Sequence, residues 1–236
     1  MLIAQFVDLS AETLVFRADQ ASRFAKQIAE DFNPIHDADS KRFCVPGDLL
    51  FASLLSKYGL SSELTCRFEG MVGDNVELHI AEQGNEVSLQ DANGKSYLTL
   101  QSSGDKHSNC QFVDQLIRDY VRFSGQNFPH ILQPLMKQHQ VMINPSRPLV
   151  IYQSMALHFH EFPEGCPQLR LSSSELLIDG KRGNVVLRFE FLYQDKVIGT
   201  GEKRMILSNL VPYDDVQMQG LVDLYNERKA TLANAA

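Results

Sequence analysis

A dense apolar run headed by Gly47-Asp48 most constrains what this chain can fold into. Residues 49–55 are all apolar except Ser53, so the segment has no polar face. A helix that is apolar on nearly all sides must be covered on nearly all sides. Short β-prone runs follow it, which predicts an α+β fold in which a bent antiparallel sheet wraps around a buried helix.

The first part of the chain predicts helices followed by strands. A β-prone stretch at 13–17 precedes an amphipathic helix that begins near Asp19 and ends before Pro34. After the buried helix, alternating patterns and the hairpin signal Ala92-Asn93-Gly94 indicate antiparallel strands. These strands are expected at 64–68, 75–81, 86–90 and 96–101.

The same order repeats after residue 104. The polar stretch 104–109 has no periodicity and is predicted to be a linker. Helices are then expected at 112–123 and 131–138, strands at 149–159, 168–178, 184–193 and 197–207, and a last helix at about 214–232. The pattern therefore predicts two units of similar layout, residues 1–105 and 106–236.

Composition excludes several classes of function. The formal net charge is −7, from 22 basic and 29 acidic residues, so the chain lacks the basic field that binds nucleic acid without sequence preference. No uncharged apolar window reaches 18 residues and no signal peptide is visible at the start, so we expect a cytoplasmic protein without a membrane partner. The four widely spaced cysteines form no C-x-x-C pair and are expected to be buried thiols.

One short segment carries residues suited to catalysis. Asp31-Phe32-Asn33-Pro34-Ile35-His36 places a carboxylate and an imidazole five residues apart, across an Asn-Pro turn. Proline fixes its own φ and moves Asn33 out of the helical region, so the turn has a defined shape. Asp31 and His36 are therefore predicted to face one cavity and to act as a general acid and base.

Three motifs in order resemble a known group of enzymes. The segment Asp31-x-Asn33-Pro34-Ile35-His36, the helix headed by Gly47, and Phe68-x-x-Met71-Val72-Gly73-Asp74 are similar to the MaoC-like and (R)-specific 2-enoyl-CoA hydratases of the hotdog fold. This resemblance covers residues 13–103, and the second half is similar only in its layout. The whole chain is also similar to an uncharacterised bacterial family of unknown function. The resemblance implies a double hotdog, with two units that each wrap a sheet around a long apolar helix.

The resemblance also implies an activity. Asp31 and His36 would together bind one water and add it across the double bond of a 2-enoyl thioester of coenzyme A or acyl carrier protein. The backbone N–H of Gly47 would stabilise the developing oxyanion, and Asn33 would support the turn beside the substrate. No metal is implied, and no cofactor other than coenzyme A as part of the substrate.

Some features depart from that pattern. The segment 37–46 is shorter than usual, and Pro46 stands where a histidine commonly precedes the glycine. At an offset of 95 residues the motif has a weak echo in which Gln126 replaces the acid and Ile131 replaces the histidine, so the second unit is predicted to have no catalytic pair.

Other functions remain open from the sequence. An acyl-CoA thioesterase using an acid and a water is one alternative, and a non-catalytic protein that binds an acyl group or small ligand is another. Ser53, Ser56 and Cys44 have no base nearby in the sequence, which argues against a covalent nucleophile. His158 and His160 share a strand face but have no third ligand nearby, so a metal site there is disfavoured. Monomer and homodimer are equally compatible with a double unit.

Overall fold

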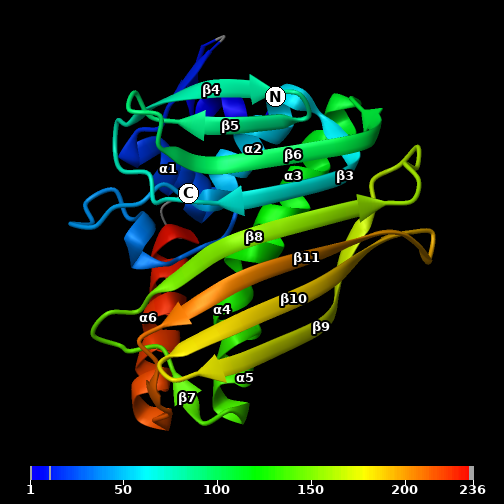
Figure 1. Ribbon diagram of the computed structural model, residues 1–236. Coiled ribbons are helices and arrows are strands. Elements are labelled where there is room, and N and C mark those ends of the chain that lie inside the picture. Colours follow the sequence, from blue (N-terminus) through cyan, green and yellow to red (C-terminus); the bar gives the residue numbers. More distant parts are fainter. Residues whose placement is uncertain (1, 11, 234–236) are drawn as a thin grey trace.

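A ten-stranded antiparallel sheet is the largest feature of the computed structural model, which describes residues 2–10 and 12–233 (Figure 1). Every neighbouring pair of strands in it is antiparallel. Across the sheet the strands are, in order, β1 (Asp8–Leu9), β2 (Thr13–Val15), β4 (Glu77–Gln83), β5 (Glu86–Gln90), β6 (Ser96–His107), β3 (Leu60–Phe68), β8 (Val150–Phe159), β11 (Lys196–Ser208), β10 (Arg182–Tyr193) and β9 (Gln168–Asp179).

The helices lie behind this sheet in the view of Figure 1. They are α1 (Ala18–Gln27), α2 (Gly47–Tyr58), α3 (Cys110–Gly125), α4 (Asn127–His130), α5 (Leu132–Gln138) and α6 (Asp215–Ala233), with short 3-10 turns η1 (Ile3–Gln5) and η2 (Pro34–His36). A separate two-stranded sheet pairs β7 (Val141–Met142) with β12 (Val211–Pro212). Among the described helices, none is long and apolar enough to cross a membrane.

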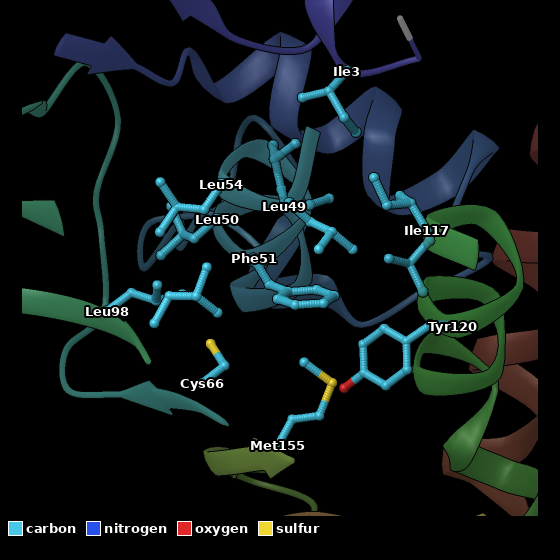
Figure 2. Close-up of a cluster of buried hydrophobic side chains, with 14 of the residues drawn as sticks. Ile3, Leu49, Leu50, Phe51, Leu54, Cys66, Leu98, Ile117, Tyr120 and Met155 are labelled. Atoms are coloured by element: carbon cyan, nitrogen blue, oxygen red, sulfur yellow. The ribbon is translucent and has the colours of Figure 1, made fainter. Parts of the chain in front are cut away.

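Helix α2 occupies the centre of the larger hydrophobic core. Its residues 48–55 are all buried, as the apolar run predicts. Gly59, with φ of 77°, ends the helix in a conformation that glycine adopts without strain. Figure 2 shows Tyr120 reaching from α3 toward Phe51 of α2 and Met155 of β8, and the Phe51 and Tyr120 rings meet edge to face at 5.4 Å. Helices α2 and α3 therefore share one core.

The two halves of the sheet are joined at its middle, where β3 pairs with β8. Their register runs from Glu63 opposite His158 to Arg67 opposite Ser154. The larger core also crosses this seam, since it includes Met155 of β8 and Phe189 of β10. A second, smaller core lies between α5 and the strands β9, β10 and β11. The hydrogen-bonded ladder and the larger core both run continuously from one half to the other.

The order of helices and strands is confirmed, but the expected linker is wrong. Strand β6 continues to His107, and Leu60 pairs with His107 at its end. The side chains along this stretch are polar and mostly exposed, so they give no apolar alternation. Backbone pairing with β3 holds the segment extended, assisted by the Asp105 N–H, which donates to Ser62 Oγ at 3.0 Å. The division of the chain near residue 105 stays a prediction.

The prediction of four buried thiols is correct for two of them. Cys44 and Cys66 are buried, whereas Cys110 and Cys166 are exposed. Cys110 is the first residue of α3, and Cys166 lies in the connection between β8 and β9, so neither is on an inward-facing position.

The difference in burial predicts that the exposed thiols react faster than the buried ones. Burial raises the pKa of Cys44 to about 11 and that of Cys66 well above its usual value, so neither forms the reactive thiolate at neutral pH. In the native protein we expect a thiol reagent to modify Cys110 and Cys166 quickly, and the other two only after denaturation. Rapid modification of all four native thiols, measured by chromophore release and peptide mapping, would contradict this burial.

Candidate functional site

The Asp31–His36 segment forms a tight turn that follows α1 and ends in η2. The side chain of Asp31 accepts the Asn33 N–H at 2.9 Å, and the side chain of Asn33 accepts the Ile35 N–H at 3.2 Å. The second bond caps η2, whose first residue is Pro34. Short polar side chains that accept nearby backbone N–H groups hold such turns in one shape. Asn33 therefore supports the turn, and it also lines the cavity described below.

The turn brings the carboxylate and the imidazole together. His36 Nε2 lies 3.4 Å from Asp31 Oδ2, and the two side chains are 13% and 16% exposed. His36 Nδ1 lies 2.7 Å from the carbonyl oxygen of Cys44. A carbonyl can only accept, so Nδ1 carries a proton and Nε2 faces the carboxylate. The two atoms are too close for a water to lie between them, so a water that hydrogen-bonds both groups would have to approach from the cavity.

Lys26 fastens this turn to α1. Its Nζ donates to the backbone carbonyls of Asp31 at 3.0 Å and Asn33 at 3.2 Å, and it forms an ion pair with Asp37 at 3.1 Å. The lysine side chain is only 7% exposed, so the three partners compensate its burial. The sequence analysis did not single out Lys26. The only sequence signal for Lys26 was its position in the last turn of the predicted helix. Basic residues are common at that position on ordinary protein surfaces.

A cavity of about 510 Å³ opens beside the pair. Asp31, His36 and Gly47 all line it, so the structure brings these three predicted residues to one space. A Cβ at position 47 would lie 3.0 Å from the Phe68 ring, so a larger residue at the start of α2 would require that ring to shift. The cavity reaches across the fold to apolar residues of the second half: Phe128, Leu132, Ile143, Val150, Ile151, Met205, Leu221 and Leu224.

The segment 37–46 returns the chain to the cavity despite its short length. The Cys44 N–H donates to the Ile35 carbonyl at 3.0 Å, and the Val45 N–H donates to the Val72 carbonyl at 2.9 Å. Pro46 is the buried residue immediately before α2. In the second half, the side-chain amide of Gln126 donates to Glu30 at 2.6 Å.

Helix α6 covers one side of the cavity. The Tyr225 hydroxyl donates to the Glu30 carbonyl at 3.0 Å, and its ring packs edge to face on Phe32 at 5.4 Å. Arg228 forms an ion pair with Asp37, the same carboxylate that holds Lys26. The sequence predicts this helix, but its position over the Asp31–His36 turn depends on contacts between residues nearly 200 positions apart.

Four buried or partly buried polar residues form a second group at the cavity wall, here called the buried polar cluster: Asp48, Ser124, Tyr152 and Lys203. Ser124 and Tyr152 line the cavity. Ser124 Oγ hydrogen-bonds Asp48 Oδ2 and Lys203 Nζ, and lies 3.2 Å from the Tyr152 hydroxyl. Lys203 Nζ lies 3.7 Å from Asp48 Oδ1 and 3.4 Å from the centre of the Tyr152 ring.

Burial perturbs both charged groups of this cluster. Lys203 has no exposed surface, and desolvation lowers its pKa to about 8 although Asp48 opposes the shift. Asp48 is 3% exposed, and its burial raises the pKa of the carboxyl while Lys203 and Ser124 oppose that shift. The sequence analysis missed this cluster because its members lie on α2, α3, β8 and β11, with no spacing that links them.

The other histidine candidates lie away from the cavity. His158 and His160 are on or next to β8, with His158 Nε2 3.1 Å from His160 Nδ1. The other nitrogen of His158 contacts Glu63. Within residues 2–10 and 12–233, no group of three or more histidine, cysteine or acidic side chains is arranged to hold a metal ion.

The fold and the site together define an α+β protein with an acid–imidazole pair at a largely apolar cavity. Residues 1–216 match the family DUF3581, described as a protein of unknown function, and the chain belongs to this family. A comparison with curated proteins found no match.

Solved structures with a related arrangement were also found. A protein of unknown function with a hot dog fold from Alicyclobacillus acidocaldarius has 9% identity and a TM-score of 0.47, covering 90% of this chain and 99% of its own. An acyl-CoA thioesterase II from Mycobacterium marinum has 9% identity and a TM-score of 0.42, covering 91% and 100%. A MaoC-like dehydratase has 10% identity and a TM-score of 0.43, covering 86% and 98%.

Proposed function

We propose that this protein is a double-hotdog acyl-thioester hydratase or dehydratase, with Asp31 and His36 as its acid and base. The observation that carries the proposal is the 3.4 Å approach of His36 Nε2 to Asp31 Oδ2 at a cavity of about 510 Å³. The substrate is a 2-enoyl thioester of coenzyme A or acyl carrier protein. Coenzyme A enters only as part of that substrate.

The proposed double-hotdog fold is supported by the order of strands and helices in the two halves of the sheet. Strands β1, β2, β4, β5, β6 and β3 form one half of the sheet in that order, and the buried helix α2 belongs to the same half. Strands β8, β11, β10 and β9 form the other half, preceded in the chain by α3 and α5. The two proposed units are residues 1–105 and 106–236.

The site is suited to adding water to a polarised double bond. A water that hydrogen-bonds both Asp31 and His36 gives a proton to this pair as its oxygen attacks the β carbon of the enoyl group. Negative charge then develops on the thioester oxygen, where the N–H of Gly47 at the start of α2 can stabilise it. The Asp31–His36 pair then delivers a proton to the α carbon, which completes the 3-hydroxyacyl thioester and returns the pair to its starting protonation state. The apolar cavity wall is suited to an acyl chain.

The test is the loss of 2-enoyl thioester absorbance with short, medium and long acyl chains, with free thiol measured in parallel. In the wild type we expect the loss of absorbance to exceed the release of free thiol. Because each acid or base group contributes about 10²–10⁴-fold, Asp31→Asn and His36→Ala should each lower kcat by at least about 100-fold. His139→Ala serves as a matched control, because His139 is an exposed residue that does not line the cavity.

Two results would overturn the proposal. One is a wild type that leaves every 2-enoyl thioester unchanged while remaining folded by circular dichroism. The other is hydration that proceeds equally well in Asp31→Asn, His36→Ala and His139→Ala. Thiol release without hydration would instead favour a thioesterase.

A further inference from the structure

Ser124 has the surroundings of an activated nucleophile, and the hydration chemistry proposed above does not use it. The residue is only 2% exposed, yet it lines the cavity. Its hydroxyl donates to the carboxylate of Asp48, and its oxygen accepts from the ammonium of Lys203. An adjacent base that takes the proton activates a serine nucleophile, and a cation beside the oxygen stabilises the negative charge that develops there.

The contacts with a carboxylate and an ammonium distinguish Ser124 from the buried Ser53. Ser53 is also buried on α2, but its hydroxyl donates to the backbone carbonyl of Leu49 at 2.7 Å and does not line the cavity. By contrast, the partners of Ser124 come from α2 and β11, 76 and 79 residues away in the sequence. Asp48 Oδ1 makes no hydrogen bond, although it faces Lys203 at 3.7 Å.

We propose that Ser124 accepts the acyl group of a thioester bound in the cavity, with Asp48 as the base and Lys203 as the cation that stabilises the serine oxygen. This gives the protein a second activity, the hydrolysis of acyl thioesters through a covalent acyl-serine. The substrate class is a saturated or unsaturated acyl thioester, because the reaction requires only the carbonyl group.

Each step conserves atoms and charge. Ser124 Oγ attacks the thioester carbonyl carbon, and its proton passes to Asp48. The C–S bond breaks, and the departing thiolate takes the proton from Asp48 and leaves as a free thiol. Water then attacks the acyl-serine ester and gives its proton to Asp48, which returns it to Ser124 Oγ as the ester bond breaks. Thioester and water are thereby converted to carboxylic acid and thiol.

The dry surroundings favour this chemistry. Burial raises the pKa of Asp48, which makes its carboxylate a stronger base than one in water. Lys203 has no exposed surface, so its attraction for a developing negative charge is weakly screened. The Tyr152 hydroxyl, 3.2 Å from Ser124 Oγ, is a further donor at the same place.

The experiment uses saturated acyl-CoA thioesters of several chain lengths, which cannot be hydrated because they have no double bond. The purified full chain is mixed with each thioester, quenched with acid and measured by intact and peptide mass. We expect thiol release together with an acyl mass on the peptide that contains Ser124. Ser124→Ala should lose both, and Asp48→Asn, which keeps the size of the side chain, should slow both by about 100-fold or more. Ser53→Ala is the matched control and should acylate at the wild-type rate.

The outcomes separate this proposal from the hydratase. An acyl mass on any residue other than Ser124, thiol release that persists in Ser124→Ala, or a wild type that neither acylates nor releases thiol would each overturn it. If Ser124→Ala fails to fold, Asp48→Asn keeps the test decisive. Acylation of Asp48→Asn at the wild-type rate would also overturn the proposal. Hydration of 2-enoyl thioesters is measured as absorbance loss in excess of thiol release, so either activity can fail alone.

Discussion

Replacing Lys203 with methionine is expected to lower the free energy of unfolding by about 3–5 kcal/mol, because it leaves the buried carboxylate of Asp48 without its cation. Methionine has a similar length and an apolar stem, but it removes the ammonium that lies over the rings of Tyr120 and Tyr152. The loss would therefore arise from the charge. Urea unfolding at neutral pH, followed by circular dichroism, measures it.

Lys95→Met is the matched control for this prediction. Lys95 is exposed and its Nζ also lies over a tyrosine ring, 4.6 Å from the centre of Tyr97. An exposed cation–π contact contributes about 0.5–1 kcal/mol, so this variant should be affected much less. The double variant Asp48→Asn/Lys203→Met should be more stable than Lys203→Met alone, because no buried charge is left unpaired. Equal effects of Lys203→Met and Lys95→Met would contradict the role of the buried charge.

The same lysine predicts a pH dependence. Its pKa in the folded protein is about 8, below the ordinary value of 10.5 that it regains on unfolding. Between these values the unfolded chain binds more protons at this group than the folded chain does, so stability should rise with pH across this window. The free energy of unfolding of the wild type relative to Asp48→Asn/Lys203→Met is expected to increase from about pH 8 to about pH 10.5.

Gly125→Ala is the second variant with a large expected effect. A Cβ at Gly125 would lie 2.1 Å from the Ala29 carbonyl oxygen and 3.1 Å from Asp31 Cβ. Asp31 begins the segment with the proposed catalytic pair and Ala29 lies two residues before it, so α3 and this part of the chain must move apart. Overpacking of this kind costs about 1–3 kcal/mol of stability. A displacement of about 1 Å at Asp31 would lower hydration by about 100-fold.

Gly220→Ala provides the comparison for Gly125→Ala. Gly220 lies on α6 and is exposed. A Cβ added there would lie more than 4 Å from every atom outside its own helix. Alanine favours a helix over glycine by about 1 kcal/mol, so this variant should be slightly stabilised and fully active. Wild-type hydration by Gly125→Ala, measured on the same 2-enoyl thioester, would show that the close contact between α3 and Asp31 is unimportant for the site.

The sequence predicted local structure well where the signal was local. Residues 49–55 predicted a buried helix because an apolar run without a polar face has one stable environment, and the Asn33-Pro34 turn predicted the meeting of Asp31 and His36. The strand at 104–107 was missed because its backbone pairs with β3 while its side chains stay polar. Lys203 reads as an ordinary strand lysine in the sequence, since its burial depends on Asp48, 155 positions away.

The pairing of β3 with β8 has a consequence for how the protein unfolds. Separating the two halves would break this ladder and expose core residues on both sides of it, including Met155. Neither half then keeps a closed hydrophobic interior, so the halves are coupled into one cooperative unit. Amide hydrogens of β3 and β8 should accordingly exchange only through global opening, and they should be among the last in the molecule to exchange with solvent.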